Sequence, residues 1–284
     1  MFGEPPRSPY DINFRLLGIP VRVHPLFWLV GLLLGMSSRE MTGMFLWVAA
    51  LFLAILVHEF GHAMTMRHYG LQPWVVLYGM GGLACYRPDQ LSYSRANTWL
   101  RQILISLAGP GAGFALAILL IVACVAAGYG VSIFVGANTG FVLRYVPGEP
   151  VVARIVQDTS VVGVFAYISG ISAPIPSALA NHLLYIGLIW GMVNLLPVYP
   201  LDGGQISREI FVRFNPRQGI RYSLILSVVT AGSLAALFLA NALRTPRDEG
   251  SGIGASLFVP MLFGYLAYSS YATLQAYDRY RSGW

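Results

Sequence analysis

The chain has 284 residues, of which 56% are hydrophobic and only 11% are charged. Soluble domains average about 25% charged residues, so this composition excludes an ordinary soluble protein and indicates a polytopic membrane protein. Every basic residue is an arginine, and the arginines lie between apolar segments, so the net charge of +6 gives no reason to expect nucleic-acid binding.

The chain begins with a polar segment followed by a short apolar one. Residues 1–23 are proline-rich and lack the apolar core of a signal peptide, so we expect a cytoplasmic N-terminal tail. His24–Met36 is the first of six predicted spans. A helical span needs about 20 residues. This segment is shorter, so it should be tilted, kinked or only partly inserted.

The second predicted span, Thr42–Met66, carries the motif His58-Glu59-Phe60-Gly61-His62. Ionisable groups at bilayer depth cost roughly 2.5–3.5 kcal/mol each, so their presence there indicates function. His58 and His62 share a helix face and can bind one divalent cation. Glu59 points off that axis and can act as the general base on a metal-bound water, which indicates a zinc hydrolase. The alternative, a surface carboxylate capped by Arg67, fits poorly between two histidines.

The connections on either side of the third span are longer than turns. Residues 71–87 hold β-prone residues around a Gly-rich turn, which predicts a hairpin that dips toward the histidines. Residues 129–181 have Val, Ile and Phe runs broken by Gly and Pro, and are expected to form a non-cytoplasmic cap or interfacial element. The third span, Ile103–Gly128, contains Gly109-Pro-Gly-Ala-Gly113, a small-residue patch that favours close helix packing.

A third metal ligand is needed, because catalytic zinc sites typically use three protein ligands and leave one position to water. Asp202 is the candidate: it follows the fourth span, His182–Tyr199, where prolines and glycines interrupt the helix. Alone it would be interpreted as a turn aspartate, and the two histidines make ligation the better interpretation. Asn194 lies in the helix before it, where from spacing alone a structural hydrogen bond between helices is favoured over a contact with substrate.

The remaining histidines and both cysteines are not expected to bind the metal. Cys85 and Cys124 are too few for a disulfide framework or a cysteine-based zinc site. His182 is the one serious alternative to Asp202, but it lies on the other side of the membrane in the predicted topology.

The last two spans, Ser223–Leu243 and Gly252–Gln275, are plain apolar helices. The arginines gather in the N-terminal tail, after the second span, after the fourth span and at the C-terminus. With an even number of spans these regions share one side, and the positive-inside rule makes that side cytoplasmic. Both termini and the end of the second span that carries the histidines are therefore expected to face the cytoplasm.

These motifs resemble those of the site-2 protease family of intramembrane zinc metalloproteases, peptidase family M50. The first family motif matches His58 to His62, and the second matches Asn194-Leu-Leu-Pro197 together with Leu201-Asp202-Gly203. The Gly-rich hairpin, the lead-in to the first span and the third-span signature also look similar, at Gly79–Ala84, Arg22–Pro25 and Ala108–Pro110. The resemblance covers about Arg22 to Gly204.

The expected fold is an all-α membrane protein. It is a bundle of six transmembrane helices with a membrane-embedded β-hairpin between the second and third, without PDZ or CBS domains. Residues 24–204 would form the catalytic core, and residues 205–284 a cytoplasmic loop with the last two helices. The resemblance implies one Zn²⁺ per chain, with ligands His58, His62 and Asp202.

By the same resemblance, Glu59 would activate the zinc-bound water, and Asn194 becomes a plausible contact for the oxyanion or substrate. The substrate would be a transmembrane protein, such as a membrane-tethered regulator, in the lipid bilayer of a bacterial inner membrane. Its helix must unwind before cleavage, and the unwound strand would pair with the hairpin. The substrate-binding residues implied are Gly79, Gly81, Gly82 and Leu83.

Two features depart from the family pattern, and two other functions compete. Gly111-Ala-Gly113-Phe114 stands where many relatives carry an asparagine, and residues 129–181 are longer than the usual external connection. A membrane zincin acting on lipidated peptides would need a ligand Glu on a helix, which no apolar span supplies. A metal carrier or an inactive scaffold is the other alternative, but a carrier should have polar residues along several helices.

Overall fold

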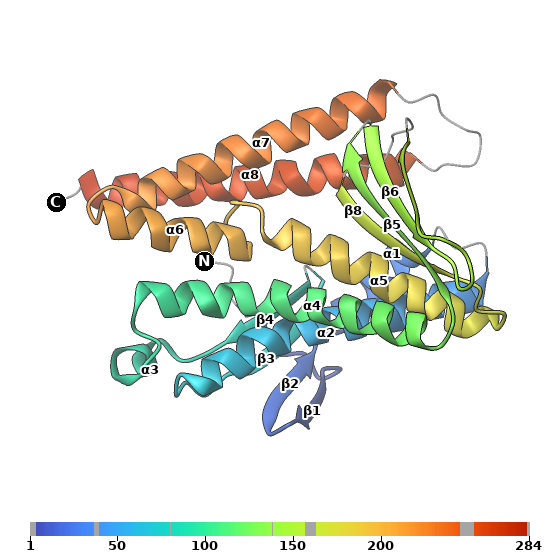
Figure 1. Ribbon diagram of the computed structural model, residues 1–284. Coiled ribbons are helices and arrows are strands. Elements are labelled where there is room, and N and C mark those ends of the chain that lie inside the picture. Colours follow the sequence, from blue (N-terminus) through green and yellow to red (C-terminus); the bar gives the residue numbers. More distant parts are fainter. Residues whose placement is uncertain are drawn as a thin grey trace. The chain divides into compact units, whose positions relative to one another are not determined.

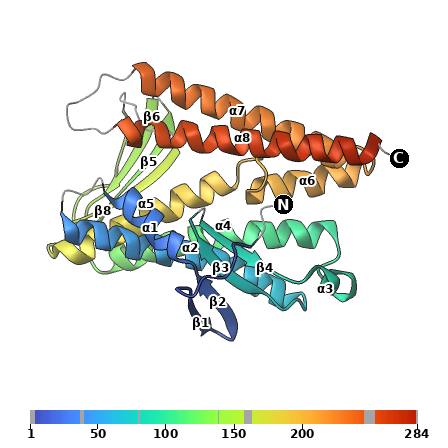
Figure 2. The ribbon, with the colours of Figure 1, turned by 180° about the vertical axis from the view of Figure 1, so that it is seen from behind.

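The computed structural model describes residues 4–36, 40–79, 81–137, 139–156, 163–244 and 253–282 of the chain. Figures 1 and 2 show its helices and strands from opposite sides. The helices are α1 Pro25–Gly35, α2 Met41–His68, α3 Pro88–Tyr93, α4 Trp99–Ala126, α5 Pro174–Asn194, α6 Asp202–Phe214, α7 Gly219–Arg244 and α8 Ile253–Ser282. The strands are β1 Ile12–Leu16, β2 Ile19–Val23, β3 Trp74–Tyr78, β4 Gly81–Cys85, β5 Gly130–Ala137, β6 Thr139–Tyr145, β7 Val152–Val156 and β8 Gly163–Ser169.

The described chain is mostly helical, and five helices are long and apolar enough to cross a membrane: α2, α4, α5, α7 and residues Leu257–Arg281 of α8. The predicted character of a multi-pass membrane protein agrees with this finding. Helix α1 has only 11 residues, in agreement with the short first span that the sequence predicts, and the described part of the chain does not confirm a count of six spans. The chain is also not all-α, because it forms two four-stranded sheets.

The chain clusters into two compact units. One contains residues 4–96 and 108–193, and therefore both sheets and the helices α1, α2 and α3. The other contains residues 97–107 and 194–284, with helices α6, α7 and α8.

The first predicted span, His24–Met36, contains helix α1 and begins directly after strand β2. Strand β2 runs parallel to β3, and α1 begins at its end, where the His24 backbone N–H donates to the Leu77 carbonyl (2.8 Å). The His24 ring caps the helix by accepting from the Leu26 N–H at 3.2 Å, so it serves the backbone.

Helix α1 packs antiparallel to the first half of α2 through glycines spaced by four residues. A Cβ at Gly31 would meet Leu51 at 3.3 Å, and one at Gly35 would meet Trp47 at 3.0 Å. The absence of side chains at these positions lets the two helices approach closely, as small residues do between membrane helices.

The predicted hairpin at residues 71–87 is present between α2 and α4. Strands β3 and β4 are antiparallel, with Trp74 opposite Cys85 and Tyr78 opposite Gly81. The sheet order is β1-β2-β3-β4, so the hairpin is continuous with the N-terminal strands, which the sequence analysis did not predict. Val75, Val76 and Leu77 are fully buried, which places both faces of β3 inside protein.

Residues 129–181 contain a second antiparallel sheet, with strand order β7-β6-β5-β8. Its Val131 and Ile168 pack with Ala117 of α4 and Leu184 of α5. The Asn181 side chain accepts from the Ile168 N–H (2.8 Å) and donates to its carbonyl (3.1 Å), and so fastens β8 to α5. The β-branched and aromatic runs that suggested a cap thus form strands.

Helix α5 is displaced along the sequence from its predicted range of His182–Tyr199. It starts at Pro174, because proline is well tolerated in the first helical turn, and it ends at Asn194 before Pro197 interrupts the chain.

In the other unit, α7 and α8 lie side by side in both ribbon views, with Phe238 stacked on Phe263 at 5.9 Å. An ion pair between Arg221 and Asp278 (3.2 Å) joins their ends.

Arg22 on β2 ties the N-terminal tail to the first sheet. Its guanidinium, which is almost fully buried, donates to Glu4 and to Asp11 at 2.8 Å each, and to the Pro5 carbonyl at 2.8 Å. The hydrogen bond from Arg22 lowers the pKa of the Asp11 carboxyl below its ordinary value of 3.8.

A lowered carboxyl pKa makes folding stability depend on pH. Asp11 stabilises the fold above its unfolded-state pKa, and the contribution is lost as the pH falls from about 4 through the lowered folded-state value. Unfolding of the detergent-solubilised protein can be followed from about pH 5 to about pH 2.5, which spans the pKa values of carboxyl groups. The stability of Asp11→Asn should depend less on pH in this range than the stability of the wild type. Asp89→Asn, exposed on α3, should retain the wild-type profile. Identical profiles for Asp11→Asn and wild type would contradict this prediction.

Candidate metal centre

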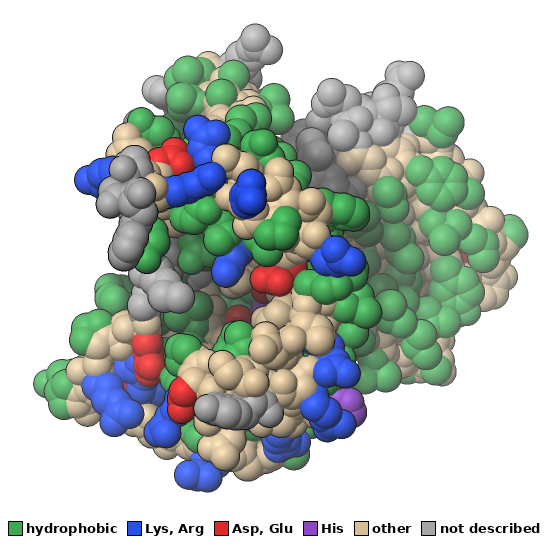
Figure 3. All heavy atoms as spheres, turned by 90° about the vertical axis from the view of Figure 1, so that its left-hand side faces the viewer, with side chains coloured by type: hydrophobic (Ala, Val, Ile, Leu, Met, Phe, Trp, Pro, Cys, Tyr) green, Lys and Arg blue, Asp and Glu red, His purple; other side chains and the backbone are tan. Residues whose placement is uncertain are grey.

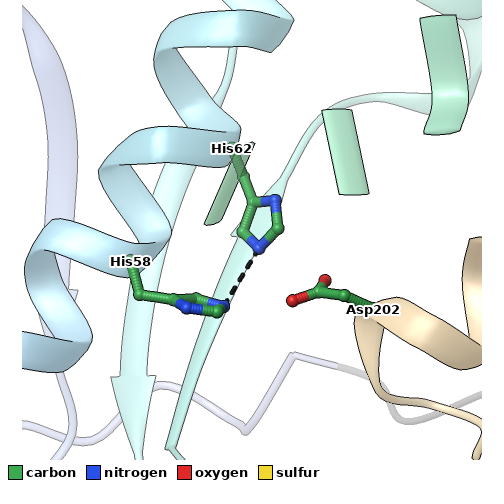
Figure 4. Close-up of side chains that lie close together, drawn as sticks. All are labelled: His58, His62 and Asp202. Atoms are coloured by element: carbon green, nitrogen blue, oxygen red, sulfur yellow. Dashed lines mark hydrogen bonds between the residues drawn. The ribbon is translucent and has the colours of Figure 1, made fainter. Parts of the chain in front are cut away.

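The two motif histidines lie on one face of α2 and point the same way (Figure 4). Their Nε2 atoms are 3.2 Å apart, and their ring centroids are 4.9 Å apart. Two nitrogens at 2.0–2.1 Å from one tetrahedral zinc ion would be separated by about 3.3 Å. The imidazole pair therefore already has the spacing of two ligands of a single metal ion.

Both rings and the carboxylate between them are withdrawn from solvent. His58, Glu59 and His62 are 3%, 4% and 6% exposed, respectively. Burial of three ionisable groups in an apolar helix is costly unless they bind a metal or have polar partners. This burial supports the inference that the motif has a function, as the sequence analysis proposed.

Glycines on neighbouring elements make room for each of these side chains. A Cβ on Gly109 of α4 would overlap the His62 ring, and one on Gly82 of β4 would overlap the Glu59 carboxylate. Gly61 of α2 faces the Ala108 carbonyl of α4, so any side chain there would push the two helices apart. The small-residue patch in the third span thus serves helix packing, as predicted, and also makes room for the His62 ring.

Asp202 is the first residue of α6 and is partly buried. The chain between α5 and α6 folds back on this helix, because Gly203 has no side chain to meet the Leu195 and Leu196 carbonyls. Gly204 likewise lies against the backbone of Val198 and Tyr199. The irregular backbone predicted around Asp202 is therefore a turn closed by two glycines, followed by a new helix.

Two serines hold this turn from the last two helices. The Tyr199 N–H donates to Ser227 Oγ on α7, and Ser270 Oγ on α8 donates to the Tyr199 carbonyl, both at 3.0 Å. Val198 is fully buried among Ala231, Phe263 and Leu266. Helices α7 and α8, which looked uninformative in the sequence, thus fix the backbone that presents Asp202.

The structure groups one carboxylate with the two imidazoles. Ligand atoms of His58, His62 and Asp202 all lie within 4.8 Å of one another, and Figure 4 shows the three side chains directed to a common point. No other group of three or more His, Cys, Asp or Glu side chains within the described ranges has this geometry. His24, His68 and His182 are outside the group.

The other predicted site residues have distinct surroundings. Asn194 is buried at the end of α5. Gly81, with φ +116°, lies beneath the Trp190 ring of α5, a contact that the sequence gave no reason to expect. Gly79 lies against Leu26 and Val30 of α1.

Comparison with known proteins decides the family. Residues 46–240 match the model of peptidase family M50, a range that includes both predicted motifs and most of the chain. The chain belongs to this family.

A curated protein and a solved structure, both from the same archaeon, are similar to this M50 chain. The zinc metalloprotease MJ0392 of Methanocaldococcus jannaschii is 25% identical over 237 residues, which cover 81% of this chain and 53% of the relative. The chain therefore spans about half the length of that curated relative. The solved site-2 protease from Methanocaldococcus jannaschii aligns with a TM-score of 0.50 at 20% identity, over 93% of this chain and 94% of that one. At this identity the likeness concerns the fold.

Filling the space behind His62 should weaken metal binding. A methyl group at position 109 must displace the ring, so we expect Gly109→Ala to lower zinc affinity by at least about tenfold, the range found when metal-supporting contacts are lost. Zinc affinity can be measured by competition with a chromophoric chelator. Gly111→Ala is the matched control, because a Cβ there meets nothing within 4 Å. Equal affinities for the two variants would contradict the proposed packing.

Loosening the turn at Tyr199 should also weaken zinc binding, because this turn positions Asp202, the third proposed ligand. Ser227→Ala combined with Ser270→Ala removes both hydrogen bonds to the Tyr199 backbone and should also lower zinc affinity, while far-UV circular dichroism stays unchanged. Thr273→Ala on α8 provides the control, since its hydroxyl bonds only within its own helix, to Ser269. Unaltered zinc affinity in the double variant would show that the turn needs no such support.

Proposed function

We propose that this protein is an intramembrane zinc endopeptidase that hydrolyses peptide bonds in or near transmembrane segments of other membrane proteins. The observation that carries the proposal is the grouping of two imidazoles and one carboxylate at a candidate membrane span. Membership of peptidase family M50 supports the reaction type. The relative MJ0392 is itself named a zinc metalloprotease.

The donor set fits zinc. Two neutral imidazoles and a carboxylate are the ligand types found at catalytic zinc sites, and three protein ligands leave a position open for water or substrate. The 3.2 Å between Nε2 atoms agrees with a tetrahedral ion. We infer one Zn²⁺ per chain, with His58, His62 and Asp202 as its ligands.

Bound zinc would polarise a substrate carbonyl and lower the pKa of a coordinated water to about 7. Glu59, next to His58 on α2, is the proposed general base that accepts a proton at its carboxylate and returns it to the leaving amine. Its contact with Gly82 fixes the carboxylate beside the hairpin. Asn194 is the proposed hydrogen-bond donor to the developing oxyanion, from the end of α5.

The hairpin is the proposed substrate platform. Strand β4 is an edge of the first sheet, so its outer backbone groups can pair with an added strand. Glu59 lies against Gly82, which would bring a strand bound along β4 close to the base. Gly79, Gly81, Gly82 and Leu83 are the residues proposed to contact the substrate.

The proposed orientation follows the arginine distribution. The N-terminal strands pair with the hairpin that follows α2, so the N-terminal tail and the C-terminal end of α2 lie at the same end of their unit. We propose that this end and both termini face the cytoplasm of a bacterial inner membrane. A membrane-tethered regulator is the proposed class of substrate.

Substitution of the base should separate metal binding from catalysis. A reconstituted protein with a single-span substrate should lose cleavage by at least about 10²-fold in Glu59→Gln while it keeps its zinc. Asp202→Ala should lose both, because one of three ligands is removed. Normal cleavage by Glu59→Gln would exclude Glu59 as the base. Zinc transport into vesicles by a wild-type protein that cuts nothing would support a metal carrier instead.

A further inference from the structure

A second candidate binding site lies in the first unit, on the sheet but away from the hairpin turn. A cavity of about 1020 Å³ opens beside β1, β2 and the start of β3, and the last turn of α2 forms part of its wall. This volume is at the upper end of the range of small-molecule pockets, about 300–1,000 Å³. The cavity is far too large for a single inorganic ion and has room for a phospholipid headgroup.

The cavity wall is strongly basic. A single carboxylate, Glu4, is among the lining residues. The arginines that line it are Arg7, Arg15, Arg22, Arg67 and Arg87. Figure 3 shows one face of the molecule, over which arginine side chains are spread together with a few acidic ones.

Only one of these arginines is neutralised. Glu4 and Asp11 both bind Arg22, so that the single acidic lining residue is already engaged. Arg67 donates to the Leu17 carbonyl at 2.6 Å, a contact that positions its guanidinium but leaves its charge uncompensated. Within the described ranges none of Arg7, Arg15, Arg67 and Arg87 forms an ion pair, so the cavity presents four cations without counter-charges.

We propose that this arginine-lined cavity binds the phosphate group of an anionic phospholipid headgroup. Guanidinium groups match phosphate oxygens in two-pronged hydrogen bonds, which favours phosphate over other anions. The site lies at the end of the candidate span α2, and Trp74 in its wall is the aromatic type enriched at membrane interfaces. Basic pockets on the cytoplasmic side of transmembrane helices bind headgroups of anionic lipids, and the proposed orientation places this cavity on that side.

Lipid binding in this cavity does not require peptidase activity. The residues that line the cavity belong to the N-terminal tail, β1, β2, the end of α2, β3 and the segment after β4. None of them is a proposed metal ligand or catalytic group. The test can therefore be made with the full chain carrying Glu59→Gln, so that loss of cleavage and loss of lipid binding are separate results.

The test is native mass spectrometry of this protein in detergent with short-chain phosphatidylglycerol, compared with phosphatidylcholine of the same length. Arg15→Gln combined with Arg87→Gln should weaken phosphatidylglycerol binding by about tenfold or more. Arg144→Gln combined with Arg154→Gln, two exposed arginines of β6 and β7, is the matched control and should bind within about twofold of the parent. Arg7→Gln with Arg15→Gln provides a second test if the first variant is unstable.

Competition experiments distinguish a phospholipid from a soluble phosphate compound and from an acidic peptide as the ligand of this cavity. Displacement of the lipid by inorganic phosphate at similar concentration supports the phosphate site but assigns it to a soluble phosphate compound. Equal binding of the two lipids, or full binding by both cavity variants, would overturn the proposal. Displacement by a short polyglutamate peptide at a lower concentration than phosphate would replace the lipid with an acidic protein segment.

Discussion

Close approach of backbone to buried polar side chains is the constraint on which the metal centre depends. Two imidazoles and a carboxylate can sit in an apolar environment only if neighbouring elements exclude solvent without occupying their space. Gly61, Gly82 and Gly109 meet this demand from three different elements, and each faces an atom that a methyl group would overlap. The burial of the three polar side chains of α2 thus depends on glycines, which have no side chains of their own.

The other ligand is presented by a different kind of structure. Asp202 stands at the start of a helix, after a turn whose backbone is hydrogen-bonded by Ser227 and Ser270. Buried polar backbone must be satisfied, and here side chains from two long apolar helices supply the partners. A carboxylate on such a turn is held by many weak contacts, whereas the histidines are held by a regular helix.

Local spacing made the helix α2, its histidine pair and the following hairpin predictable, because period and turn chemistry act within a few residues. Three features could not be found this way. The pairing of β2 with β3 joins residues about fifty positions apart, and no periodicity reports such a partner. The serines of α7 and α8 look like ordinary small residues of membrane helices, and only the fold brings them to Tyr199. The sheet in residues 129–181 was obscured for a third reason: its strands are as apolar as the neighbouring spans.

The strand that precedes α1 has a consequence for the order of folding. Strand β2 has two partners: β1, which precedes it in the chain, and β3, which follows α2. During synthesis β3 emerges only after the whole of α2. The N-terminal strands therefore cannot complete their sheet as an independent unit, and the four-stranded sheet can close only after the hairpin has been synthesised.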